Sequence, residues 1–464
     1  MKDWAPNLAT SGKPLYLAIA DALDEDIRLG RLAIGDRLPP QRRLAERLAI
    51  DFTTVARGYA EARKRGLVSS TVGMGTFICA RHPAEPAPRA DDRPGRPDIF
   101  DPSMNLPPEP TDPELIERMR AGLAAVGQDL VSLLRYQRFG GDQIDKDAAS
   151  AWLGRRALVP TQDRLFITPG AHAAMMGIFS VLATRGDTIL CEAITYPGAR
   201  AISAQLGLNL LGLPMDEHGV DPAALDEACR LRKPKALYLN PTLHNPTTLT
   251  VPEARRAELV AVCRRHNLPI VEDDAYGFLL QKGPHPFAAL APDLTWHIAG
   301  LAKCIGAGLR AAFVVTPSAK AAWPFAAAMR AANVMASPLT VALATRWIED
   351  GTADSILRNI RAETRARQAL AAEILPPGAF KADPLSFCLW LTLSEGWTRS
   401  AFAEHMRQTG LGVVSSDAFT ASGVPPEAAR VCLGGPISRE KLANALGFMA
   451  HALNEAPSLA TSFV

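Results

Sequence analysis

The first 80 residues show apolar positions at helical spacing, followed by apolar positions at strand spacing. Gly30 and Gly66 each follow the last periodic residue of a helical stretch, and Asp51 is placed to cap the stretch that ends at Gly66. The predicted elements are helices over 14–30, about 41–49 and 51–66, and two short strands within 67–78. Three helices and a hairpin predict an α+β winged helix-turn-helix over residues 1–80.

Residues 81–97 hold five prolines and almost no large apolar side chain, which predicts an extended, semi-rigid linker. From residue 98 to the end, short β-branched runs alternate with helical stretches. Strands are predicted over 165–168, 188–191, 236–239, 269–272 and 312–315, with helices over 172–183, 222–232 and 252–266. This alternation predicts an α/β domain with a mostly parallel sheet covered on both faces. Its large part spans about 98–340, and a small α/β subdomain with strands over 387–391 and 430–433 spans about 345–455.

Composition narrows the class of protein. Of the 464 residues, 48% are hydrophobic and 21% are charged, which is typical of a soluble globular protein of two or three domains. The net charge is +4 over residues 1–82 and −2 over the remainder, so a modestly basic segment precedes a near-neutral body. Seven scattered cysteines without a CxxC pair argue against a disulfide framework or a zinc site. With neither a signal peptide nor an apolar run of membrane length, we expect a cytoplasmic protein.

The segment 38–48, the run that begins at Thr53, and the run 66–78 resemble the GntR winged-helix family over nearly all of residues 14–80. The resemblance implies that the third helix enters the major groove of double-stranded DNA and that the hairpin lies at the adjacent minor groove. The side chains and backbone placed to contact the duplex are those of Arg42, Thr53, Thr54, Arg57 and Gly73. The alternative is that these are ordinary surface polar residues. Phe52 stands where many family members have a basic or polar residue, which leaves the base preference there open.

In the second domain, Lys303 lies between small apolar residues and Arg310 follows seven positions later. A lysine in such a run is either an ordinary surface residue or a partly desolvated amine that can form a Schiff base with an aldehyde. The planar guanidinium of Arg310 suits a phosphate. An aldehyde-trapping lysine and a phosphate-binding arginine suggest pyridoxal 5′-phosphate (PLP).

Further motifs stand in a fixed order along the chain. They are Thr168-Pro-Gly-Ala-His172, Thr195-Tyr-Pro-Gly198, Asn240-Pro-Thr-Leu-His-Asn-Pro-Thr247, Asp273-Asp-Ala-Tyr276, Lys303 and Arg310. Taken singly, most of these residues are more often turn or packing residues. In this order they resemble the fold type I, aminotransferase-like PLP family over about residues 100–455.

The resemblance implies a role for each residue. Lys303 would form the internal aldimine and Asp273 would pair with the pyridinium nitrogen. The remaining cofactor residues would be Asn245 and Tyr276 at the phenolic oxygen, Tyr196 stacked on the ring, and Gly170, Ala171, His172 and Arg310 at the phosphate. Arg430 matches the arginine that binds a substrate α-carboxylate. Tyr136 matches the tyrosine that contributes to the phosphate site of the partner subunit.

Two residues near the expected phosphate site depart from the family pattern. Family members usually carry serine three residues before the lysine and often directly before it, whereas this chain has Gly300 and Ala302. The missing hydroxyls put the tightness of PLP binding in doubt and leave the lysine chemistry intact. Cys304, next to Lys303, is either a redox switch or a small buried thiol, the second being the more common case.

A GntR-type winged helix, a proline-rich linker and an aminotransferase-like domain together resemble the MocR subfamily of bacterial regulators. The resemblance implies a homodimeric, PLP-dependent transcriptional regulator whose DNA binding responds to PLP or to an amino compound at the Lys303 aldimine. The first alternative is an amino acid aminotransferase with an accessory DNA-binding domain. The second is a DNA-binding regulator with a remnant domain that holds no PLP.

Overall fold

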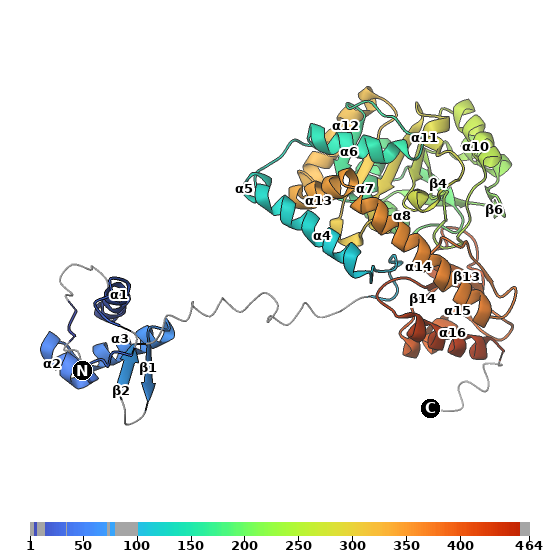
Figure 1. Cartoon of the computed structure of the whole chain (residues 1–464). Coiled ribbons are helices and arrows are strands. Elements are labelled where there is room, and N and C mark those ends of the chain that lie inside the picture. The colour runs from blue at the N-terminus through green and yellow to red at the C-terminus, as the bar shows by residue number, and fades with distance from the viewer. Residues whose placement is uncertain (1–3, 7–13, 34, 72–74, 79–100, 455–464) are drawn as a thin grey trace. The chain divides into compact units, whose positions relative to one another are not determined.

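A computed structural model describes residues 4–6, 14–33, 35–71, 75–78 and 101–454 of the chain (Figure 1). Two compact units are present, Met1–Ile99 and Phe100–Val464. The predicted linker 81–97 lies outside the described residues, as does Gly73 in the predicted hairpin turn. In the part of the chain that is described, no helix is both long and apolar enough to cross a membrane.

The N-terminal unit has the predicted order of three helices and a hairpin. Its elements are α1 (Leu15–Arg28), α2 (Gln41–Leu48), α3 (Phe52–Lys64), β1 (Val68–Thr71) and β2 (Gly75–Ile78). Asp51 caps α3, because its side chain accepts a hydrogen bond from the Thr53 backbone N–H. Ile19 and Leu23 of α1 pack with Leu44, Val55 and Tyr59 in one buried cluster. The winged-helix prediction is therefore confirmed.

The large part of the second unit contains a seven-stranded sheet. Along the sheet the strands are β3 (Leu165–Thr168), β11 (Ala312–Val315), β10 (Thr295–Gly300), β9 (Ile270–Asp273), β8 (Ala236–Leu239), β4 (Thr188–Glu192) and β5 (Asn209–Leu213). β11 pairs antiparallel with both neighbours, and every other neighbouring pair is parallel. The predicted mostly parallel sheet is confirmed.

Helices cover both faces of this sheet. One face packs against α7 (Ala171–Leu182), α8 (Pro197–Leu206) and α12 (Ala319–Asn333). The other packs against α6 (Gln143–Gly154), α9 (Pro222–Arg232), α10 (Glu253–Arg265) and α11 (Phe287–Leu290). Around them lie α4 (Pro113–Val126), α5 (Leu130–Leu133) and α13 (Pro338–Glu349), and a small hairpin is formed by β6 (Met215–Asp216) and β7 (Gly219–Val220).

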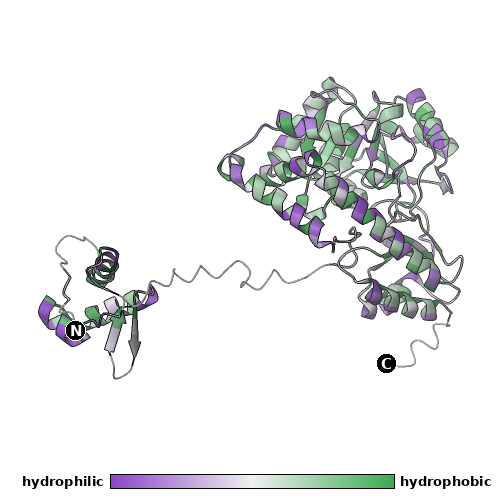
Figure 2. Cartoon of the chain, viewed as in Figure 1, coloured by the Kyte–Doolittle hydropathy of each residue, from purple (hydrophilic) through white to green (hydrophobic). Residues whose placement is uncertain are grey.

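The long helix α14 (Thr352–Ile374) leads into the small subdomain. There the strands β12 (Phe380–Lys381), β13 (Cys388–Thr392), β15 (Ala428–Cys432) and β14 (Val413–Ser415) form an antiparallel sheet, flanked by α15 (Arg399–Met406) and α16 (Arg439–Asn454). Hydrophobic and hydrophilic residues are interspersed along the whole of α14 (Figure 2). Its buried residues, such as Ile356 and Ile360, recur every three to four positions.

Two strands of the large sheet were not predicted. β10 contains His297 and ends at Gly300, and both residues obscure its apolar pattern although the whole strand is buried. β5 is an edge strand of only five residues that begins at an exposed Asn209. Both strands are fixed by pairing with their neighbours rather than by local preference.

Candidate functional site

The carboxyl ends of β3, β8, β9 and β10 meet at one edge of the large sheet, where a cavity of about 530 Å³ opens. In open α/β sheets ligands bind at this edge, and the volume suits a small molecule or cofactor. Among the residues that line it are Gly170, Ala171, His172, Tyr196, Asn245, Asp273, Tyr276, Lys303 and Arg310. The cavity thus brings together nine of the ten residues predicted to bind the cofactor.

Lys303 ends the short helix η4 (Leu301–Lys303), directly after β10. Its ammonium donates a hydrogen bond to the backbone carbonyl of Asn105. Burial lowers the pKa of Lys303 to about 8, and the positive charge of Arg430 acts in the same direction. A larger share of the amine is therefore neutral near pH 7 than for a solvated lysine, as a reaction with an aldehyde requires.

Asp273 ends β9 with its carboxylate buried beside the cavity. One oxygen, Oδ2, accepts a hydrogen bond from the Tyr238 hydroxyl at 3.0 Å. The other, Oδ1, is buried without a partner among the described residues. Burial raises the pKa of Asp273 to about 6. A buried carboxylate oxygen that lacks a donor fits a protonated ring nitrogen in the cavity.

Asn245 and Tyr276 also line the cavity. The Asn245 Oδ1 accepts a hydrogen bond of 2.9 Å from Arg430, so its amide N–H group is the end left for a ligand oxygen. The Tyr276 hydroxyl accepts a hydrogen bond of 3.0 Å from the Asn105 side chain. Its own proton therefore remains available for a ligand, and burial raises the pKa of Tyr276 far enough to keep it.

Another part of the cavity wall suits an anion. Gly170 precedes α7 with φ of +91°, a backbone conformation that favours glycine, and a Cβ there would lie 3.2 Å from Arg310 Nη2. The N–H groups in the first turn of α7 and the Arg310 guanidinium thus border one space. His172 and Tyr196 meet edge to face, with ring centroids 5.6 Å apart. Burial lowers the pKa of His172, with Arg310 and Lys303 as further causes, so the imidazole is neutral at pH 7.

Gly300 and Ala302, the two departures from the family pattern, also line this cavity. A Cβ added at Gly300 would lie 3.5 Å from the Ala171 Cβ, an ordinary contact, so no steric reason demands glycine there. Cys304 points elsewhere, because its thiol donates weak hydrogen bonds to the carbonyls of Gly300 and Leu301 and is fully buried. The structure favours the packing interpretation of Cys304.

Arg430, the predicted carboxylate-binding residue, is buried on β15 next to Asn245. Its Nη2 group donates to the backbone carbonyl of Ser103, and its Nε is buried without a partner among the described residues. The segment 103–105, which we call the strap, therefore accepts hydrogen bonds from both Arg430 and Lys303 through its backbone carbonyls.

Three polar residues at this site were not predicted from the sequence. Asn105 bridges Lys303 and Tyr276, Tyr238 holds Asp273, and the Asn240 side chain donates to the Asp273 carbonyl at 2.7 Å. Asn240 stood in the motif that identified Asn245, so its position offered a signal. Tyr238 lies inside an apolar strand and Asn105 in a proline-rich loop, where no pattern distinguishes them.

In the N-terminal unit, Thr53, Thr54 and Arg57 lie on the first turns of α3 and Arg42 lies at the start of α2, whereas Gly73 lies outside the described residues. The Thr53 hydroxyl donates to Asp51, and the Thr54 side chain is half-buried. The Arg57 guanidinium lies 4.3 Å from the ring centroid of Tyr16, and that of Arg42 lies 5.9 Å from the ring centroid of Phe52. The two arginines are thus held over aromatic rings of the same unit.

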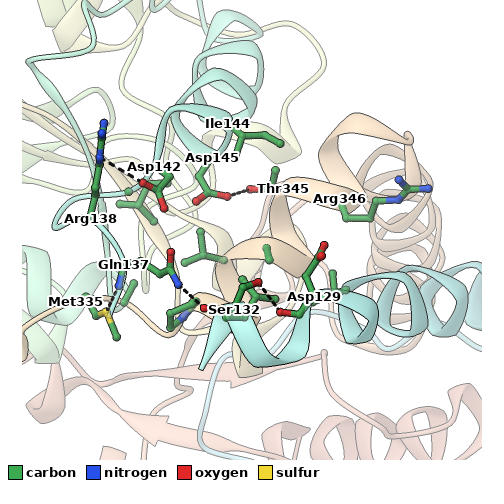
Figure 3. Close-up of a pocket in the computed structure, with 18 of the residues that line it drawn as sticks. Asp129, Ser132, Gln137, Arg138, Asp142, Ile144, Asp145, Met335, Thr345 and Arg346 are labelled. Carbon is green, nitrogen blue, oxygen red and sulfur yellow. Dashed lines mark hydrogen bonds and ion pairs between the residues drawn. The ribbon is translucent and has the colours of Figure 1, made fainter. Parts of the chain in front are cut away.

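Tyr136 lies outside the Lys303 cavity and is 85% exposed. The segment just after it, including Gln137 and Arg138, lines a second cavity of about 320 Å³ between α5, α6 and α13 (Figure 3). In Figure 3 Arg138 pairs with Asp142, and Asp145 accepts a hydrogen bond of 2.7 Å from Thr345. Burial raises the pKa of Asp145. Both of these acids thus have a partner within this cavity.

Comparison with known proteins gives matches over both units. The family described as aminotransferase class I and II matches residues 103–448, and the family of bacterial regulatory proteins called gntR matches residues 15–78. The uncharacterized HTH-type transcriptional regulator YdeF of Bacillus subtilis (strain 168) is 28% identical over 454 residues, covering 97% of each chain. The HTH-type transcriptional regulator TauR of Rhodobacter capsulatus is 27% identical over 410 residues, covering 79% of this chain and 81% of TauR.

Solved structures match the second unit in fold. The α-aminoadipate aminotransferase LysN of Thermus thermophilus has a TM-score of 0.70 at 23% identity, covering 78% of this chain and 94% of LysN. The kynurenine aminotransferase of Pyrococcus horikoshii has a TM-score of 0.69 at 23% identity, covering 77% of this chain and 91% of that enzyme. The predicted fold type I architecture is confirmed.

Proposed function

The chain belongs to the aminotransferase class I and II family and carries a gntR-family domain, the architecture of the MocR subfamily, and on this premise we propose that it is a PLP-dependent transcriptional regulator. We propose further that it senses PLP or a small amino compound through Lys303. The 28% identity to YdeF over nearly the full length of both chains supports the regulatory assignment.

The cavity residues fit PLP, the cofactor of this family. Lys303 would hold its aldehyde carbon, Asp273 its ring nitrogen, Asn245 and Tyr276 its phenolic oxygen, and Arg310 with the start of α7 its phosphate. The Asp273 Oδ1, which has no partner among the described residues, and the wall formed by Gly170, the start of α7 and Arg310 support this assignment. When bound, PLP supplies an aldehyde that reacts with amines and a ring that withdraws electrons. Lys303 is the residue placed to take and return a proton at that aldehyde carbon.

The observation that supports sensing is the position of the strap. Residues 103–105 follow closely after the predicted linker, and their carbonyls accept hydrogen bonds from Lys303 and Arg430. A ligand that reacts with Lys303 and places a carboxylate against Arg430 competes with both carbonyls. We infer that such a ligand displaces the strap and so changes the start of the connection to the DNA-binding unit.

We propose that the protein acts as a homodimer on two DNA half-sites. Near Tyr136 the second unit exposes several large apolar side chains, namely Leu130, Val131 and Leu134. Such a patch on one unit is typical of a protein interface. A partner covering it would place Tyr136 for the role predicted from the family, at the partner's phosphate site.

The test uses the full-length protein and a DNA duplex selected from a random pool for tight binding. PLP and then a panel of amino compounds are added while fluorescence anisotropy reports the DNA affinity. We expect at least one compound to change the affinity in the wild type and not in Lys303→Ala. Steady turnover to keto acid with no ligand effect on DNA binding would favour the aminotransferase function. An absent PLP absorption band would favour a PLP-free remnant.

A further inference from the structure

Cys388 and Cys432 face each other across two strands of the small sheet. They are direct partners in the antiparallel register of β13 and β15. The Cys432 backbone N–H donates to Gly412 on the far side, whereas the next residue, Leu433, donates to Phe387 on the β13 side. The Cys388–Cys432 pair is therefore a non-hydrogen-bonded pair of the antiparallel ladder, with both side chains on the same face.

This register brings the two thiols within bonding reach. In a non-hydrogen-bonded pair the Cα atoms are about 4.5 Å apart. A disulfide needs a Cα separation of roughly 4.4–6.8 Å. A pair of this kind lies inside that window, so a disulfide can form without backbone rearrangement.

We propose that Cys388 and Cys432 form a reversible cross-strand disulfide that makes the Lys303 site responsive to oxidants. Both residues are free, buried thiols in this structure. They are near the charged groups of the site, because Lys303 and Arg430 interact electrostatically with both sulfurs.

The strap lies against this pair and contacts both sulfurs. The Cys432 thiol points at the Ser103 carbonyl at 3.8 Å, and the Cys388 sulfur lies 3.8 Å from the Asn105 amide nitrogen. Ser103 and Met104 of the strap are exposed, so this side of the buried pair borders a solvent-accessible segment. Cys388 also lies 3.4 Å from the Ser386 hydroxyl.

The oxidant we name is a peroxide. Burial raises the pKa of the Cys388 thiol to about 11, which keeps this thiol mostly protonated near pH 7. The Cys432 sulfur attacks one peroxide oxygen, the O–O bond breaks, one water leaves, and a sulfenic acid remains. The Cys388 sulfur then attacks the Cys432 sulfur, the S–O bond breaks, the S–S bond forms, and a second water carries away the protons. Two thiols lose two electrons and the peroxide gains them.

The disulfide changes what the strap contacts. The Cys432 S–H group no longer donates to the Ser103 carbonyl, and the Cys388 sulfur turns from Asn105 toward its new partner. Oxidation therefore removes two contacts that hold the strap. One of them is made by Asn105, the residue that also accepts from Lys303 and donates to Tyr276. The formation of the bond stands on geometry alone, whereas its effect on ligand sensing rests on the proposed function.

The full-length protein is treated with excess hydrogen peroxide, free thiols are blocked, and peptides are mapped by mass. We expect a peptide pair joined by Cys388–Cys432, a loss of two free thiols, and full reversal by dithiothreitol. Cys388→Ser and Cys432→Ser should each abolish the joined peptide. Cys263→Ser, which removes a buried thiol on α10 away from the site, should leave it unchanged. The proposal is overturned if Cys388 and Cys432 stay free while other thiols are oxidised. It is also overturned if either of them pairs with a different cysteine.

A second readout separates this inference from the proposed function. The rate of PLP capture is compared in the reduced protein, the oxidised protein and oxidised Cys432→Ser. We expect a change of several-fold in the oxidised wild type that dithiothreitol reverses, and none in the variant. A mapped disulfide with an unchanged capture rate overturns the link to Lys303. Absence of PLP capture in the reduced protein overturns the proposed function and leaves the mapped disulfide standing.

Discussion

The reaction of Lys303 with PLP should depend on pH with a midpoint near 8, because burial and Arg430 lower the pKa of this amine from 10.5. Only the neutral amine attacks an aldehyde. At pH 7 about one-tenth of a group with a pKa of 8 is neutral, against about one in 3,000 for a pKa of 10.5, a gain of roughly 300-fold. This shift in pKa means that protonation of Lys303 is about 3 kcal/mol less favourable than protonation of a solvated lysine.

Two substitutions at one position test the cause. Arg430→Met removes the positive charge that is the second cause of the lowered pKa, whereas Arg430→Lys retains a charge. We expect the midpoint to rise in Arg430→Met and to stay near 8 in Arg430→Lys. The rise should be partial, since burial, the larger cause, remains. Arg399→Gln, a substitution of a surface arginine paired with Asp417 and Glu427, is the control.

The assay follows the PLP absorption band by stopped flow from pH 6 to pH 10 at constant ionic strength. The proton dissociation of free PLP over this range is measured separately. A midpoint near 10 in the wild type would refute the desolvated state of Lys303. Equal midpoints in Arg430→Met and the wild type would refute the role of Arg430.

Three further predictions concern other parts of the chain. Burial raises the pKa of Asp273 from 3.8 to about 6. The stability that protonated Asp273 contributes to the PLP-free protein should therefore be full below about pH 4 and lost as pH rises through 6. Urea unfolding should show this loss of stability in the wild type and not in Asp273→Asn. Tyr238→Phe removes the hydrogen bond to Asp273 and should lower the free energy of unfolding by about 1 kcal/mol, with unchanged stability contradicting the bond. Arg57→Ala should weaken DNA binding and reduce the salt dependence by about one counterion, unlike Arg63→Ala at the other end of α3; equal effects would argue against a contact by Arg57.

The local sequence pattern was sufficient to predict those elements whose surroundings are determined by neighbouring residues in the sequence. The strands over 165–168, 236–239 and 312–315 were predicted with the observed bounds, because buried strands between turn signals are distinctive. Asp273 was found because it stands at the end of a predicted strand, at the ligand edge. Its placement with Lys303 in one cavity came from the family resemblance and not from any local signal.

Contacts between distant segments could not be predicted. Asn105 reaches Lys303 across 198 residues and Tyr276 across 171, and it stands in a proline-rich loop without periodicity. The partner of Cys388 depends on the register between β13 and β15, which is set by the packing of the small sheet. These are the contacts on which the sensing and redox proposals depend.

The proposed role of the strap predicts a difference between classes of ligand. Its hold on Lys303 and Arg430 consists of two hydrogen bonds from charged groups, each contributing about 1.5–3 kcal/mol. PLP alone competes for Lys303, whereas an amino compound with a carboxylate also competes for Arg430. An amino acid should therefore change the DNA affinity of the PLP-loaded protein more than the amine lacking its carboxylate. Allosteric coupling is typically about 1–3 kcal/mol, or roughly 5–150-fold in affinity. Matched pairs of amino acid and amine, tested by anisotropy, should show a difference in this range that Arg430→Met abolishes. Equal effects of the two ligands would show that the Ser103 contact plays no part in the response.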